Sequence, residues 1–141
     1  MTQSIESQVS RWGLVPLRLA VGVVFLMHGL QKIFVFGISG TAGILDWVSI
    51  PLASFFAVVL MIAEVGGGLA ILLGAGARLA GAALAIEMTV AIFRARVQGG
   101  FFTPNGYEFE MVLAGACLLF AMMGSGGLSL DQLWKGRAAA N

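Results

Sequence analysis

Among the ionisable side chains in the long apolar stretches of this 141-residue sequence, six are the candidates that could do chemistry. They comprise one imidazole, two cations and three carboxylates: His28, Lys32, Glu64, Glu87, Arg94 and Glu108. A charge at the centre of a membrane helix costs about 2.5–3.5 kcal/mol, so these groups cannot all face lipid unpaired. We expect them to meet in a polar pocket that binds an anionic or quinone-like ligand or transfers protons. The open alternative is a set of ion pairs that only hold helices together.

Helical spacing supports such a convergence. At about 100° per residue, Arg18, Gly22 and Lys32 share one stripe of a first helical segment. Glu87 and Arg94 lie two turns apart on one stripe of a later segment. Small residues on these stripes let membrane helices approach closely. A lone helix histidine is more often a packing residue than a ligand, so His28 is a candidate only together with the other ionisable residues.

Other common sites find no support in the sequence. A di-iron bundle needs Glu-x-x-His pairs, and the only histidine has no glutamate three residues before it. Cys117 is the only cysteine, which excludes a CxxC motif and an internal disulfide. We therefore expect no metal site and no intrinsic redox group. Electron chemistry would need a bound quinone or a partner protein.

Composition indicates where these residues reside. Hydrophobic residues make up 59% of the chain and charged residues 11%, whereas an ordinary soluble domain is about 45–50% apolar. This excludes a water-soluble monomer. The net charge of +1, without basic clusters, excludes a nucleic-acid partner. The expected partner is the lipid bilayer, while redox partner proteins and a homo-oligomer stay open.

Four segments are long and apolar enough to cross about 30 Å of hydrocarbon, which takes about 20 helical residues. They cover residues 14–36, 52–73, 78–97 and 107–123. Glycine-rich connectors at 37–43 and 74–77 separate the first three segments. The sequence thus predicts an all-α membrane protein, a four-transmembrane-helix antiparallel bundle. It forms a single domain, 1–141, that ends in an interfacial tail, 124–141.

The charges outside the apolar segments suggest an orientation. Placing both termini in the cytoplasm gives a positive-inside count of five to three: Arg11, Arg18, Arg78, Lys135 and Arg137 against Lys32, Arg94 and Arg96. We expect a multi-pass protein of the cytoplasmic (inner) membrane, with Arg18 and Arg78 as structural residues or anchors. Its polar pocket would open outward. Phe101 and Phe102, set among turn residues, are a candidate lid over it.

Several of these residues stand in a pattern that resembles the DoxX family of small four-helix bacterial and archaeal membrane proteins. The pattern runs from about residue 17 to 131. Its order and spacing are specific: RLAVG at 18–22, HGLQK at 28–32, EVGGG at 64–68, Gly74 before RLA at 78–80, and GFF at 100–102 before NGYE at 105–108.

The resemblance implies a cytoplasmic-membrane protein with four transmembrane helices in a redox setting. Members of the family have been associated with thiosulfate:quinone oxidoreduction and with membrane complexes that handle thiol or oxidative stress. The family-pattern positions are Arg18, His28, Lys32, Glu64, Arg78 and Glu108. Glu87 and Arg94 are candidates from depth and spacing alone.

Together these observations predict a subunit or accessory protein of a quinone-linked redox system, one that handles thiol or sulfur compounds or oxidative stress. It would be an oxidoreductase subunit without a redox group of its own. Two other interpretations stay open, a small proton-coupled transporter and a structural membrane subunit with no ligand.

Overall fold

The computed structural model describes residues 12–138, and all regular structure in that range is helical. The expectation of an all-α chain is therefore confirmed for this part of the sequence. The elements are α2 (Leu14–Gln31), η1 (Lys32–Phe36), α3 (Gly37–Trp47), α4 (Ala53–Leu73), α5 (Ala77–Ala91), η2 (Ile92–Arg96), η3 (Val97–Gly99), α6 (Glu108–Met123) and α7 (Leu130–Ala138). Arg11, which entered the positive-inside count, lies outside the described residues, as do the side chains of Lys135 and Arg137.

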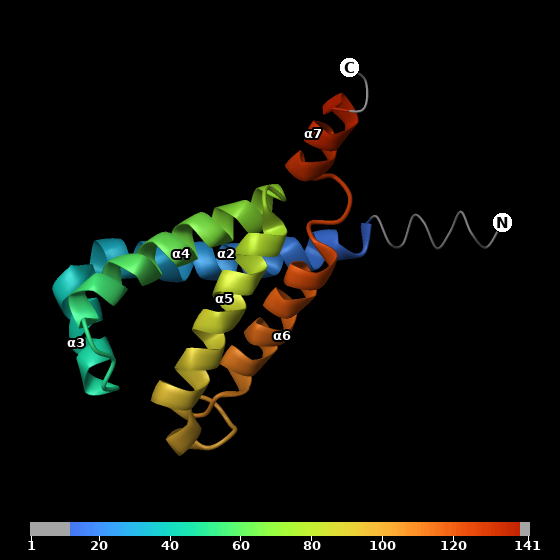
Figure 1. Ribbon diagram of the computed structural model, residues 1–141. Coiled ribbons are helices and arrows are strands. Elements are labelled where there is room, and N and C mark those ends of the chain that lie inside the picture. Colours follow the sequence, from blue (N-terminus) through green and yellow to red (C-terminus); the bar gives the residue numbers. More distant parts are fainter. Residues whose placement is uncertain (1–11, 139–141) are drawn as a thin grey trace.

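The helices form two antiparallel pairs, α2 with α4 and α5 with α6 (Figure 1). The two pairs cross instead of running parallel, and α7 extends away from them. The turn between α4 and α5 is tight because Gly74 and Gly76 both adopt positive φ angles, of 67° and 64°. This turn makes α4 and α5 neighbours, and their contact joins the two pairs.

The segment 37–43, which the sequence predicts to be a connector, is part of a helix. Gly37 has φ 66°, which changes the chain direction, and α3 then continues to Trp47. Thr41, Ala42 and Leu45 of α3 are buried, and the last two pack on the start of α4. This burial outweighs the weak helix propensity of glycine, serine and threonine.

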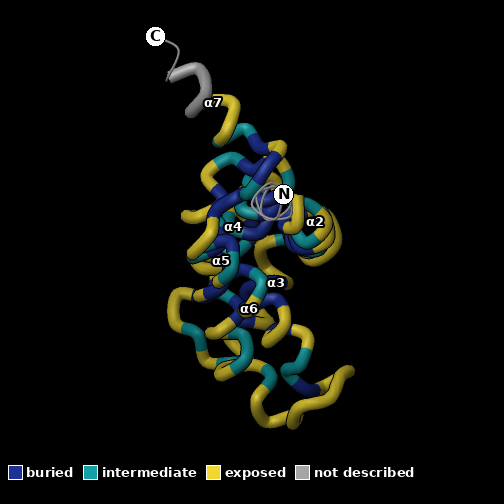
Figure 2. Tube along the Cα trace, turned by 90° about the vertical axis from the view of Figure 1, so that its right-hand side faces the viewer, coloured by how far each residue is buried: buried dark blue, intermediate teal, exposed yellow. Residues whose placement is uncertain are grey.

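The core lies where the two helix pairs cross. Large side chains from all four long helices meet there, among them Phe25, Ile71, Leu84 and Phe120, each at most 1% exposed. Cys117 is fully buried in the same cluster, as a small apolar residue would be. Exposed residues lie mainly on the outward faces and on the loop after α5 (Figure 2). The apolar outward faces suit a lipid environment.

Two helical segments are long and apolar enough to cross a membrane, Leu14–Trp47 and Ala53–Leu73. The other two helices of the pairs are shorter, with 15 residues in α5 and 16 in α6. At 1.5 Å per residue, each alone covers roughly 22–24 Å.

Candidate functional site

The candidate site forms at the contact between α2 and α4. Glycines allow this contact, because a Cβ on Gly68 would lie only 2.7 Å from the backbone nitrogen of Leu26. One on Gly29 would lie 2.8 Å from the nitrogen of Val65. The small residues thus bring the two backbones together, as their spacing suggests. Glu64 then lies within reach of α2.

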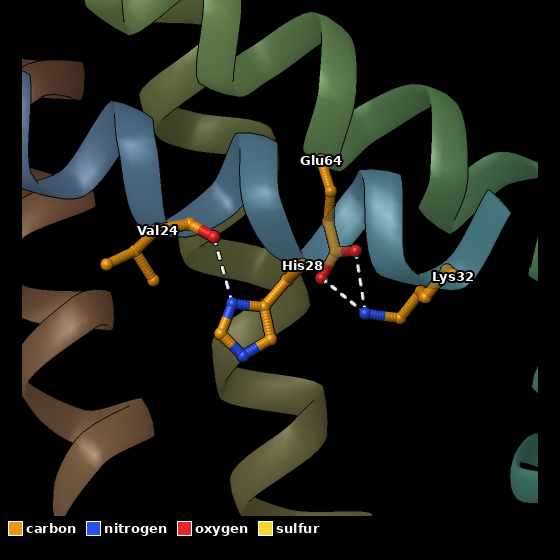
Figure 3. A network of polar contacts seen from close by, with 4 residues as sticks. All are labelled: Val24, His28, Lys32 and Glu64. Atoms are coloured by element: carbon orange, nitrogen blue, oxygen red, sulfur yellow. Dashed lines mark hydrogen bonds and ion pairs between the residues drawn. The ribbon is translucent and has the colours of Figure 1, made fainter. Parts of the chain in front are cut away.

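Lys32 and Glu64 form a two-pronged ion pair across this contact (Figure 3). The Lys32 Nζ donates to both carboxylate oxygens of Glu64, at 2.7 and 2.6 Å. Glu64 is only 3% exposed, whereas the Lys32 side chain retains 20% exposure. Such a pair offsets the cost of removing two charges from water only when its geometry is good, as it is here. Lys32 is also the first residue of η1, and π-helical turns frequently occur at functional sites.

Glu87 brings a second carboxylate to this pair from α5. Its carboxyl group lies close enough to the Glu64 carboxylate and the Lys32 ammonium for their charges to act on it. One of its oxygens, Oε2, is buried and has no hydrogen-bond partner. Two carboxyl groups therefore lie near one ammonium group, whose hydrogen bonds go to Glu64. We call Lys32, Glu64 and Glu87 the carboxylate cluster.

His28 lies one turn before Lys32, and both side chains project from the same flank of α2 (Figure 3). Its Nδ1 is 2.9 Å from the carbonyl oxygen of Val24. Because a carbonyl oxygen only accepts, this contact places a proton on Nδ1 and leaves Nε2 of the neutral ring free to accept one. The ring also lies 6.2 Å from that of Phe109 in α6.

A groove of about 430 Å³ runs along α2 beside His28. Its lining is mostly apolar and comes from Met27, His28, Leu30, Gln31 and Val35. Met27 and Val35 are 59% and 69% exposed, so the groove is open to the surroundings of the helix. An apolar groove with few polar groups is typical of small-molecule sites.

Arg94 does not join the carboxylate cluster, contrary to the expected convergence. Its Nη2 donates to the carbonyl oxygen of Ser49, in the turn between α3 and α4. The predicted stripe with Glu87 assumes 3.6 residues per turn throughout, but η2 (Ile92–Arg96) is π-helical. The wider turn rotates Arg94 off the face that carries Glu87.

Glu108 also lies apart from the cluster, which corrects the second part of that expectation. Its Oε1 accepts hydrogen bonds from the backbone nitrogen and the hydroxyl of Thr103, at 2.7 and 2.6 Å. Glu108 begins α6, and a carboxylate there can turn back toward the preceding loop. The residue therefore orders the α5–α6 connection.

The two candidate lid residues lie in that same connection. Phe101 packs edge to face against both Phe102 and Tyr107, with ring centroids 5.2 and 5.5 Å apart. The backbone nitrogens of Tyr107 and Glu108 donate to carbonyls of the same loop, at Gly100 and Phe101. The described contacts thus hold the aromatic rings against their own loop.

The sequence interpretation missed a second ion pair, between Arg96 and Glu110. The Arg96 Nε donates to Glu110 Oε1 at 3.0 Å, and Glu110 is only 9% exposed. The two-residue spacing places Glu110 on a different face of α6 from Glu108, so helical periodicity alone does not indicate its partner. The signal that could have identified it is the short connection, which returns the chain beside η2 within a few residues.

Arg18 and Arg78 both lie at the other end of the helix pairs. Arg18 is 4% exposed, and its terminal nitrogens donate to the carbonyl oxygens of Ser125, Gly127 and Leu128. Arg78 is exposed in the first turn of α5. Arg18 thus holds the loop that follows α6.

Comparison with known proteins accounts for this arrangement of glycines and charges. The sequence pattern of the DoxX family matches residues 13–97. The chain belongs to the DoxX family. The expected resemblance is therefore confirmed. The match contains the whole carboxylate cluster, His28 and Arg94, and it ends before Glu108.

Curated relatives extend the similarity over most of the chain. "Putative oxidoreductase CatD" of Bacillus subtilis is 32% identical over 130 residues, covering 92% of each protein. "Uncharacterized membrane protein Rv3486" of Mycobacterium tuberculosis is 35% identical, covering 88% of this chain and 82% of the relative. An "Uncharacterized protein" of Haemophilus influenzae is 33% identical, covering 82% and 85%. No solved structure matches the chain significantly. This is a DoxX-family membrane protein with a relative whose name suggests redox chemistry.

Proposed function

We propose that this DoxX-family protein is a membrane component of a quinone-linked redox system that handles thiol or sulfur compounds or oxidative stress. One observation carries the proposal: the free Nε2 of His28 lies beside an apolar groove, one turn from the carboxylate cluster. A binding surface and a group of proton acceptors are thus adjacent on α2. The relative named as an oxidoreductase supports the redox setting.

The groove suits the chemistry of a lipid-soluble quinone. Its volume of about 430 Å³ falls in the range of small-molecule sites, roughly 300–1,000 Å³. Because Met27 and Val35 are exposed, a molecule dissolved in the bilayer could enter from the side. A quinone, when bound, supplies two-electron chemistry with uptake or release of two protons. The electrons would pass to or from a partner protein, since a protein without a redox group supplies binding and protons only.

The chain's own residues would move the protons. His28 Nε2 can accept a proton from a hydroquinone hydroxyl, or donate one to a quinone oxygen once the ring is charged. The carboxylate cluster places two carboxyl groups near one ammonium in a poorly solvated place, where two unshared negative charges would be costly. A proton held there removes one of these charges, and the unpartnered Oε2 of Glu87 is a natural site for it.

We also propose that α2, α4, α5 and α6 all cross the inner membrane, with both termini in the cytoplasm. The helical path from Ala77 through η2 to Arg96 has the roughly 20 residues that a span requires. Labelling of single cysteines, placed at residue 75 and at residue 103 in a Cys117→Ala background, tests this orientation. Residue 75 should react only from the cytoplasm and residue 103 only from outside.

Binding of decylubiquinone to the purified full chain in uncharged detergent tests the central proposal. Calorimetry should show saturable binding that weakens at least roughly tenfold in His28→Ala, because the hydrogen bond between the imidazole and the quinone is lost. Tyr107→Phe, which removes one hydroxyl from an aromatic residue outside the lining of the groove, should bind normally. Equal binding by the wild type and His28→Ala would contradict the assignment of the groove.

A second arm separates binding from proton transfer. Glu87→Gln should still bind decylubiquinone, while quinone-dependent turnover in membranes containing the native partners should fall. The transporter interpretation rests on the same buried Glu87 oxygen and predicts a different outcome. In that case proteoliposomes would show proton-coupled flux that Glu64→Gln abolishes, without any dependence on quinone.

A further inference from the structure

A cavity of about 460 Å³ lies far along the helices from the carboxylate cluster, where the α4–α5 turn meets the loop between α6 and α7. Its lining contains one cation, one carboxylate and a run of small residues. These are Leu14, Gly76, Arg78, Met123, Gly124, Ser125, Gly126, Gly127, Asp131 and Gln132. None of these residues takes part in the proposed quinone chemistry.

Arg78 lines this cavity. Among the described side chains, which end at residue 134, it has no hydrogen-bond or ion-pair partner. Asp131 lines the same cavity, but its oxygens accept from the backbone nitrogen of Gly76 at 2.9 Å and from the hydroxyl of Ser125 at 3.2 Å. The Asp131 carboxylate therefore holds the α4–α5 turn to the loop after α6, and the Arg78 guanidinium stays available to an anion.

A second guanidinium lies behind the wall. Arg18 is only 4% exposed, and its guanidinium donates to the carbonyl oxygens of Ser125, Gly127 and Leu128. Its Nε is buried without a partner, and no carboxylate pairs with it in the described part of the chain. Carbonyl dipoles solvate this charge but do not neutralise it. Two arginines thus face a single aspartate at this end.

We propose that the cavity binds a phosphate group, with Arg78 as its main ligand. Guanidinium matches phosphate with two parallel hydrogen bonds, and Arg78 is an exposed residue in the lining of the cavity. The buried charge of Arg18 adds positive potential from behind. Basic pockets of this kind between membrane helices accept phospholipid headgroups, and free phosphate offers the same chemistry.

Thermal unfolding of the purified full chain in uncharged detergent tests this proposal. Phosphatidylglycerol should raise the unfolding temperature more than phosphatidylcholine does, and native mass spectrometry should show a retained phosphatidylglycerol molecule. Arg78→Gln should weaken this retention roughly tenfold, because a charge-assisted hydrogen-bonded contact is lost. A parallel titration with inorganic phosphate reports whether the free ion alone gives the same Arg78-dependent protection.

Arg94→Gln is the matched control, since it removes one exposed arginine at the opposite end of the helices. Dependence on Arg78 but not on Arg94, with either phosphate source, supports the site. The source that gives the protection identifies the ligand as lipid-borne or free. Equal losses in the two variants indicate non-specific charge attraction and overturn the proposal. So does unchanged lipid retention in a folded Arg78→Gln protein.

Discussion

Replacing Lys32 by methionine should destabilise the protein through the charge that it leaves behind. Methionine retains the length of the side chain but not the ammonium group that contacts both oxygens of Glu64. Glu64, at 3% exposure, cannot turn to solvent, so its charge would stay buried without its partner. Removing one partner of a buried ion pair costs about 3–5 kcal/mol. Because Lys32 retains 20% exposure, we expect roughly 2–4 kcal/mol.

The same argument predicts that a second substitution recovers most of this loss. In Lys32→Met with Glu64→Gln, no charge is left unpaired at the original ion pair, so the double variant should be more stable than Lys32→Met alone. The four proteins form a double-mutant cycle, which isolates the interaction between the two residues. Equilibrium unfolding in detergent micelles, followed by the fluorescence of the tryptophans, gives each free energy of unfolding.

The interaction energy between Lys32 and Glu64 shows whether the two residues form a buried pair. We expect an interaction energy of at least about 1.5 kcal/mol, well above the roughly 0.3–0.5 kcal/mol found for independent sites. Phe102→Met is a control for a long apolar substitution at an exposed loop position, and it should leave the free energy of unfolding nearly unchanged. An additive cycle would falsify the claim that Lys32 and Glu64 form a buried pair.

Three further predictions follow from contacts elsewhere in the molecule. Gly68→Ala should cost about 1–3 kcal/mol of unfolding free energy, because the new Cβ meets the backbone of Leu26. Gly66→Ala, in open space on the same helix, should be neutral or stabilising. Equal unfolding temperatures for the two variants would refute the close α2–α4 contact. Arg96→Gln should cost about 1–2 kcal/mol of unfolding free energy, which is less than the loss of a fully buried ion pair because the Arg96 side chain is 43% exposed. Adding Glu110→Gln in the same chain should restore part of this free energy. If chemical unfolding shows no such recovery, the ion pair is not present. Arg18→Met should speed amide hydrogen exchange in residues 125–128, because carbonyl groups of this loop lose the donor that holds them. Arg78→Met in lipid-free detergent should leave the exchange unchanged. Similar exchange in both variants would show that Arg18 does not hold this loop.

The sequence determined the helices and most of their limits. Hydrophobic segments predicted at 52–73 and 107–123 agree with α4 and α6 within a residue. The agreement follows because apolar length and flanking glycine or proline are local properties of the chain. Membership of the DoxX family was also predictable from the sequence, because it depends on the order and spacing of sequence motifs and not on tertiary contacts.

The pairing of charges within the site was predictable only where the helices stay regular. Lys32 and Glu64 meet as the small-residue stripes suggest, because glycines at 22, 29 and 68 permit one close approach. Arg94 was assigned to the same cluster by extending a 3.6-residue period into a segment that is π-helical. A change of helical period depends on packing around the segment, and the sequence alone carries no clear signal for it.

Tertiary structure also decided which partner each remaining charge takes. Glu108 bonds its own loop, Glu110 pairs with Arg96, and the predicted loop 37–43 is helical because α4 covers it. The sequence by itself established a helical membrane chain with too many charges to leave unpaired. Only the three-dimensional packing decided which charges meet, because hydrogen-bond geometry depends on shifts of an ångström that composition and periodicity do not encode.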